Sequence, residues 1–75
     1  MKFKIGQNVR EIASGYECMI VATKEEPWKK SADPYNRPEI YPENGNDYIV
    51  IIKIAEDEYR GTMHVYENQL EQIEN

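Results

Sequence analysis

The strongest strand pattern in the chain is a mostly apolar segment from residue 47 to residue 54, in the second half of the chain. If this segment is a strand, apolar side chains fill both of its faces, because side chains alternate along a strand. One face carries Tyr48, Val50, Ile52 and Ile54, and the other carries Ile49, Ile51 and Lys53. Strands of this kind are usually central in a sheet or covered by another segment or chain. The pattern therefore predicts a central, covered strand.

Two shorter segments of β character precede it, at 9–13 and 18–23. The second is rich in β-branched residues, and the Ser14-Gly15-Tyr16 sequence between the two is typical of a tight turn. We therefore expect a hairpin closed around these three residues. Its second strand would place Met19 and Val21 on one face and Cys18 and Ile20 on the other.

A charged turn at 55–58 leads into a further strand at 59–66. Its alternation predicts inward positions for Tyr59, Met63 and Val65 and outward positions for Arg60, Thr62 and His64. Gly61 in its middle marks a bulge or a tight bend. The last segment, 67–73, is too short for an isolated helix and predicts one helical turn followed by a short closing strand.

The segment 24–46 is different in character, because it holds all four prolines and the one tryptophan. Each proline removes a backbone donor and fixes φ, so no regular strand or helix can run through the segment. We expect one long loop that contains at most a short turn of helix or a minor hairpin.

This order of elements is that of a small five-stranded SH3-like barrel, all-β, with one long loop rich in proline and aromatic residues and a short helical turn before the last strand. The chain also resembles the YodC-like group of small bacterial proteins and, more loosely, Tudor-type domains. The matching positions are glycines, turn residues and inward apolar residues: Ile5-Gly6 with Val9, Ser14-Gly15, Met19 with Val21, and Val65, Glu67 and Leu70 in HVYENQLEQI. The resemblance implies the fold and brings no catalytic residues with it.

Length and charge narrow the function classes. Seventy-five residues make a single domain, 1–75, with little room for a core. The net charge of −5 disfavours nucleic acid as a partner, because phosphate contacts need a basic surface. Lys2 and Lys4 are not followed by an apolar run, and the longest such run, at 49–52, is far shorter than a membrane span. We therefore expect a cytoplasmic protein that does not associate with membranes.

The aromatic side chains of the long loop are the strongest candidates for a binding site. Flat rings presented on loops offer a large contact area at a low entropy cost, so we expect a protein or peptide ligand. The candidate residues are Trp28, Tyr35 and Tyr41, with help from Tyr16 or Tyr66. The main alternative in function is a nucleic-acid-associated regulatory protein that uses Lys29, Lys30 and Arg37.

Two structural interpretations compete with a binding role for these rings. The loop can fold back and use its rings to cover the second face of the strand at 47–54, since a small domain needs every large apolar group. Alternatively, a second copy of the chain can cover Ile49 and Ile51, or exchange the long loop, and so form a homodimer.

No motif in the sequence predicts a cofactor, a metal or an enzyme. Cys18 and His64 are the only soft metal ligands, and no spacing selects further ligands for zinc. We interpret Cys18 as a small hydrophobic residue and His64 as an outward residue of a strand. The acidic runs at 25–26 and 56–58 lack the ligand spacing of a calcium loop and are expected to be solvated turns.

Overall fold

Seven strands and one turn of 3₁₀-helix are found in residues 2–29 and 39–73, which are the residues that the computed structural model describes. The elements are β1 (Asn8–Glu11), β2 (Glu17–Thr23), β3 (Trp28–Lys29), β4 (Glu39–Ile40), β5 (Tyr48–Ala55), β6 (Glu58–Val65), η1 (Glu67–Gln69) and β7 (Leu70–Gln72). No helix in these two ranges is long and apolar enough to cross a membrane. The prediction of an all-β chain is confirmed.

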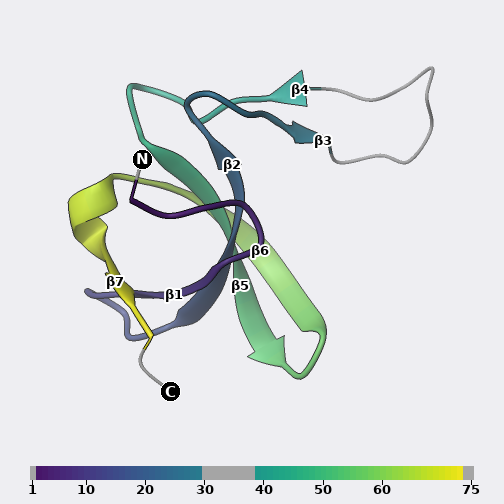
Figure 1. The fold of residues 1–75 in the computed structure, drawn as a ribbon. Coiled ribbons are helices and arrows are strands. Elements are labelled where there is room, and N and C mark those ends of the chain that lie inside the picture. Colours follow the sequence, from purple (N-terminus) through teal and green to yellow (C-terminus); the bar gives the residue numbers. More distant parts are fainter. Residues whose placement is uncertain (1, 30–38, 74–75) are drawn as a thin grey trace.

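Five of the strands form one antiparallel sheet in the order β6-β5-β2-β1-β7. The sheet is strongly curved, so that β1 and β7 cross the direction of β5 and β6 (Figure 1). The predicted hairpin around Ser14-Gly15-Tyr16 is confirmed, with Arg10 opposite Glu17 at its closed end. The turn needs its glycine, because Gly15 has a φ of 77°. The prediction that β5 is central is also confirmed, since it pairs with both β2 and β6.

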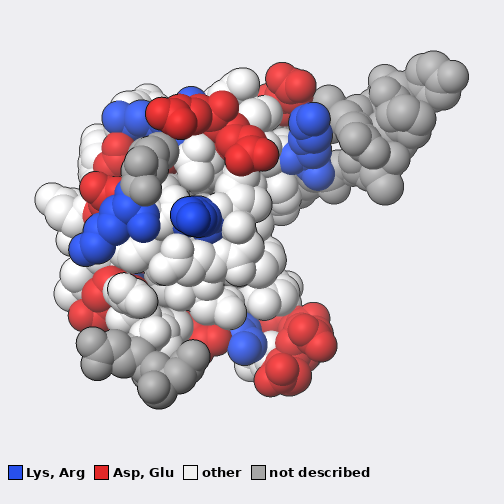
Figure 2. Space-filling view, in the orientation of Figure 1, with Lys and Arg blue, Asp and Glu red and all other residues white. Residues whose placement is uncertain are grey.

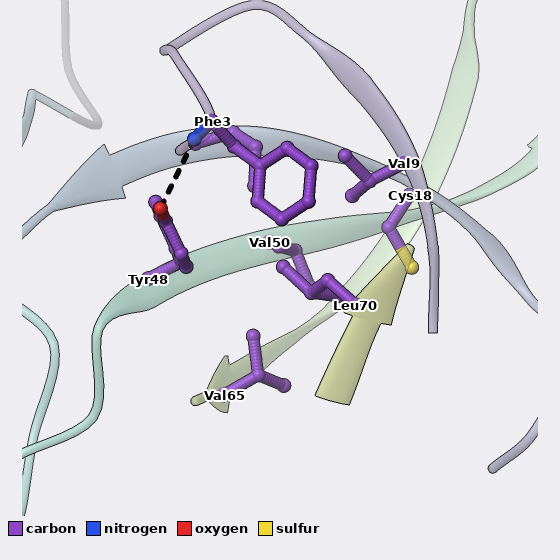
Figure 3. Packing of buried hydrophobic residues seen from close by; sticks show 8 residues of the cluster. Phe3, Val9, Cys18, Tyr48, Val50, Val65 and Leu70 are labelled. Atoms are coloured by element: carbon purple, nitrogen blue, oxygen red, sulfur yellow. Dashed lines mark hydrogen bonds between the residues drawn. The ribbon is translucent and has the colours of Figure 1, made fainter. Parts of the chain in front are cut away.

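The main core lies on the inner side of the curved sheet, where side chains from five strands and the N-terminal segment meet (Figure 3). Its buried members are Phe3, Val9, Cys18, Ile20, Tyr48, Val50, Val65 and Leu70. The predicted faces of β2 hold as far as Val21: Cys18 and Ile20 belong to this core, whereas Met19 and Val21 lie on the outer face. A register shift between Ile20 and Ala22 then interrupts the alternation, so that Ala22 lies on the outer face as well. The family resemblance implied that Met19 and Val21 point inward, and this prediction is wrong.

A second, smaller core covers the outer face of the sheet. Val21, Ala22 and Ile49 are its buried members, and Trp28 and Ile40 pack against them. These two large side chains sit opposite each other in the β3–β4 hairpin, which is the minor hairpin expected within the long loop. The loop thus covers the second face of β5, as one of the competing interpretations predicted for Trp28.

A bulge near Gly61 changes the direction of the side chains at the start of β6. Ile51 pairs with Thr62, but two residues later Lys53 pairs with Tyr59, so β6 has one residue more than β5 in this interval. Gly61 supports the bulge with a φ of 79°. Because the extra residue inverts the alternation, Tyr59 shares the outer face with Ile51, and the prediction that it points inward is wrong.

The end of the chain has the predicted form, with η1 leading into β7, which pairs with β1. The N-terminal segment is fastened to η1 and β5 through one buried hydroxyl. Tyr48 donates a hydrogen bond to Oε1 of Glu67 (2.7 Å) and accepts one from the Phe3 N–H (3.1 Å; dashed in Figure 3). The Lys2 N–H donates to the same Glu67 oxygen at 2.9 Å. These bonds hold the N-terminal segment over the inner core.

Candidate functional site

Two of the five candidate aromatic residues, Trp28 and Tyr41, lie together at one hollow of about 360 Å³. We call it the Tyr41 hollow. Its lining comes from the N-terminal segment, β2 and the β3–β4 hairpin, and consists of Ile5, Val21, Glu26, Pro27, Trp28, Lys29, Glu39 and Tyr41. Trp28 is half-buried against the outer core, whereas Tyr41 and Ile5 are 48% and 40% exposed. The exposed rim of the hollow therefore combines apolar side chains with the charged residues Glu26, Lys29 and Glu39.

Local hydrogen bonds explain why these segments meet. The Thr23 hydroxyl accepts the N–H groups of Glu25 and Glu26 (both 3.1 Å), which turns the chain sharply from β2 towards β3. The Gly6 N–H donates to the Ile20 carbonyl at 2.8 Å and places the N-terminal segment along β2. Ile5 thereby comes beside Val21. Ile5 is not one of the binding residues predicted from the sequence.

A hydrogen bond to His64 anchors the turn that follows Tyr41. The Glu43 N–H donates to Nδ1 of His64 at 3.0 Å, which ties the turn after Tyr41 to β6. Within that turn, Asn46 donates from its backbone N–H (2.9 Å) and its side chain (2.7 Å) to the Glu43 carbonyl. His64 is an outward residue, as expected, and its ring supports the backbone of the loop.

Trp28 also lines a second hollow, of about 370 Å³. We call it the Tyr59 hollow; its lining residues are Trp28, Ile51, Tyr59, Arg60, Gly61 and Thr62. Its β6 residues reach this face because the bulge at Gly61 turns Tyr59 outward. Trp28 therefore forms a wall shared by two hollows.

Charged residues line both hollows. Glu26 and Glu39 line the Tyr41 hollow with Lys29, whereas Arg60 lines the Tyr59 hollow and also a separate hollow with Tyr16 and Ile52. Figure 2 shows red along the upper edge of the molecule, over β4 and the turn from β2 to β3, and blue over β3. Among the described residues these four side chains form no ion pair.

The other candidate aromatic residues lie elsewhere. Tyr16 is 55% exposed and lines a separate hollow with Ile52, Lys53, Ile54 and Arg60. Tyr66 is 46% exposed, and its hydroxyl donates to the Asn44 carbonyl at 3.4 Å. Tyr35 lies outside the described residues. The structure thus brings Trp28 and Tyr41 together and does not join Tyr16 or Tyr66 to them.

The surface proposed for a homodimer is largely used within the chain itself. Ile49 is 1% exposed, because Val21, Ala22 and the β3–β4 hairpin cover it. Ile51 is half-buried and lines the Tyr59 hollow. Of the residues proposed to contact nucleic acid, Lys29 is exposed and lies opposite Glu39 in the register of β3 and β4, and Lys30 and Arg37 lie outside the described residues.

Cys18 lies in the inner core and is completely buried. Burial, together with the nearby carboxylate of Glu11, raises the pKa of its thiol to about 11. A thiol of this kind is a poor nucleophile, which agrees with its interpretation as a small hydrophobic residue. In residues 2–29 and 39–73, no three side chains of His, Cys, Asp or Glu are grouped closely enough to hold a metal ion.

Comparison with known proteins found no matching family model, no matching curated protein and no matching solved structure.

Proposed function

We propose that this chain is a non-enzymatic interaction module of SH3-like barrel fold, which binds a protein or peptide segment in the Tyr41 hollow. One observation carries the proposal: Trp28, Tyr41 and Ile5 come from segments far apart in the chain and converge on one hollow. Two of these three large apolar side chains are substantially exposed. Exposed apolar clusters framed by polar residues are typical of sites for protein partners.

The chemistry of the lining suits an extended segment of polypeptide. Aromatic rings and the flat Pro27 ring supply rigid contact area that loses little conformational entropy on binding. Lys29, Glu26 and Glu39 provide polar groups at the same hollow, which can select among ligands. An apolar floor with a few polar groups is the usual composition of a binding site.

The barrel assignment is supported by the strand order and by the closing turn. Two hairpins, a 3₁₀ turn and a short last strand that returns to β1 follow one another in the order expected for an SH3-like barrel. The two blocks that resemble the YodC-like group fall in these same elements. Such barrels present loops at one side of a rigid sheet, and the long loop of this chain carries Trp28 and Tyr41.

The test uses a pair of tyrosines with nearly equal exposure. Short peptides are selected from a random displayed library on the wild-type chain, and their binding is followed by the fluorescence of Trp28, the one tryptophan. We expect Tyr41→Ala to weaken binding at least tenfold, as loss of a central aromatic anchor does. The matched control is Tyr66→Ala, which should bind as the wild type does, because Tyr66 lies away from the hollow.

Two outcomes would contradict the proposal. One is that the library yields no peptide whose binding changes Trp28 fluorescence. The other is that Tyr41→Ala and Tyr66→Ala bind the selected peptides equally well. Retention of the chain on a phosphate matrix, weakening steeply with salt, would instead favour the nucleic-acid alternative through Lys29.

A further inference from the structure

The turn at 41–46 joins the β3–β4 hairpin to β5, and a histidine of β6 holds it in place. The Glu43 N–H donates to Nδ1 of His64 at 3.0 Å. Within the described part of the chain, this is the first hydrogen bond outside the strands that ties the backbone to the sheet after β4. Tyr41 lies two residues before Glu43 and lines the Tyr41 hollow. The course of the chain at Tyr41 is therefore set by Ile40, which packs on the outer core, and by the bond to His64.

This bond requires the neutral form of His64, with its proton on the other ring nitrogen. A backbone N–H can only donate, so Nδ1 must offer it a lone pair. In the charged imidazolium both ring nitrogens carry a proton and neither can accept. Protonation would therefore place two N–H groups face to face and break the bond. An imidazole is the side chain whose charge ordinarily changes between about pH 5 and pH 8.

On the side of β5, the groups around His64 keep their charge state in this range. Ile49, which lies opposite His64, is apolar. Just before β5, the Asp47 carboxylate accepts the Glu67 N–H (2.7 Å) and pairs with Lys24 (3.0 Å). These two contacts lower the pKa of Asp47, so it stays ionised as the histidine titrates.

On the side of the turn and β4, the carboxylates of Glu43 and Glu39 are exposed and form no ion pair in the described ranges. The Tyr66 hydroxyl donates to the Asn44 carbonyl at 3.4 Å, a long bond that is compatible with either form of His64. This bond lies beyond Glu43 in the chain. Protonation of His64 therefore loosens the part of the turn that leads back to β4, while the later part stays attached.

We infer that His64 makes the Tyr41 hollow sensitive to pH, so that the hollow binds its peptide more weakly once the ring is protonated. This inference rests on the proposed function of the Tyr41 hollow. Loss of the Glu43 bond frees the chain on the C-terminal side of Tyr41, so this ring is no longer fixed at the hollow before the ligand arrives. Binding must then also order the turn, which lowers the affinity. The effect is limited to the contribution of one hydrogen bond, roughly threefold to tenfold in affinity.

The test measures the affinity of peptides selected on the wild-type chain at about pH 8 and about pH 5. His64→Asn is the matched control, because an asparagine Oδ1 can accept the Glu43 N–H in place of Nδ1 and does not titrate. The fall in affinity should be roughly threefold to tenfold larger in the wild type than in His64→Asn. His64→Leu has no acceptor and should bind more weakly than the wild type at pH 8. Glu43→Gln keeps the backbone N–H and should respond to pH as the wild type does.

The turn itself can be followed without a ligand, by the NMR signal of the Glu43 amide proton. This signal should change together with the ring signals of His64 in the wild type and stay constant in His64→Asn. A Glu43 signal that does not follow His64, or an equal fall in affinity in the wild type and His64→Asn, would overturn this inference. If the selected peptides still depended on Tyr41 in those cases, the proposed function would stand. If their binding did not depend on Tyr41, the proposed function itself would fail.

Discussion

The hydroxyl of Tyr48 is the point at which the N-terminal segment, β5 and η1 are joined, and Tyr48→Phe removes that one oxygen. Tyr48 is completely buried, and Phe3 is 2% exposed. The hydroxyl accepts from the Phe3 N–H at 3.1 Å and donates to Glu67 Oε1 at 2.7 Å. The substitution keeps the ring, which meets the Phe3 ring edge-on with centroids 5.7 Å apart. Its effect therefore reports the hydrogen bonds and not the packing.

The expected loss of stability has two parts. The Phe3 N–H is left buried without its acceptor, which costs about 1–3 kcal/mol, and a hydrogen bond between the hydroxyl and a carboxylate is lost. We expect the free energy of unfolding to fall by about 2–4 kcal/mol. For a domain of this size the total is on the order of 5 kcal/mol, so much of the stability depends on this hydroxyl.

Urea denaturation followed by Trp28 fluorescence measures the effect. The midpoint should move to lower urea with the slope unchanged, which is the sign of a stability change without a change in the unfolded state. Tyr66→Phe is the matched control, because its exposed hydroxyl makes only a 3.4 Å contact, and should change stability by less than about 0.5 kcal/mol. If Tyr48→Phe were no more destabilising than this control, the reasoning would be refuted.

The same pair of proteins should differ in their response to acid. The Tyr48 hydroxyl, followed by the Lys2 N–H, stabilises the charged form of Glu67 and holds its pKa below the usual 4.5. A lowered pKa contributes stability above pH 4.5 that is lost as the pH falls through the lower folded value. Tyr48→Phe removes the largest cause of the shift, so its stability should decline less over this range. The pKa of Asp47 is also lowered, by the Glu67 N–H and by Lys24. Its contribution to the pH dependence of stability should be the same in both proteins.

Three further predictions concern the two cores and the bulge. Ile49→Ala should cost about 2–5 kcal/mol in urea denaturation, whereas Ile54→Ala, at a position 47% exposed, should cost under 1 kcal/mol; equal losses would contradict a second core. Gly61→Ala should cost about 1–2 kcal/mol because of its φ of 79°. Steric crowding adds nothing to this cost, because the nearest atom to an added Cβ is 3.9 Å away. An unchanged midpoint would argue against the bulge. Alkylation of Cys18 by iodoacetamide should be slow in native buffer and fast in urea, and rapid native labelling would show that the thiol is accessible.

The alternation of side chains could be predicted wherever a strand lies in a regular ladder. The period of two correctly grouped Cys18 with Ile20 and Tyr48 with Val50, and both pairs lie in the inner core, where Ile20 is opposite Val50. The turn at Ser14-Gly15 could be predicted because only glycine adopts its positive φ without strain. In these places local chemistry and tertiary packing require the same conformation.

The face of the sheet on which Tyr59 lies could not be predicted from the alternation. The glycine two residues later indicated a bulge, but a glycine does not tell how many residues the partner strand contributes in the same interval. One extra residue in β6 moves Tyr59 to the other face, and a second register shift restores the register where Glu58 pairs with Ala55. Only the pairing with β5 reveals these shifts. The outward position of Tyr59, and with it the Tyr59 hollow, could not be predicted from the sequence.

The Tyr41 hollow could be predicted only in part. Proline spacing and aromatic content marked the loop, but strands of two residues have no periodicity, so the pairing of Trp28 with Ile40 left no pattern in the sequence. Ile5 reaches the hollow through backbone hydrogen bonds from Gly6 and Ile20, which any residue at position 5 would share. The only signal in the sequence was the glycine that follows Ile5, which the structure shows with a φ of 90°.

The covering role of Trp28 is compatible with the proposed binding role, because the residue packs on the outer core and also lines the two hollows. Its neighbours in the outer core are Val21, Ala22 and Ile49. A ligand that contacts Trp28 in the proposed site would bind only when the outer core is folded, so its binding should stabilise the fold. A ligand at a hundred times its Kd would add about 2.7 kcal/mol. In so small a domain this gain is comparable to the loss expected from Tyr48→Phe, so a bound peptide should restore much of that variant's resistance to urea.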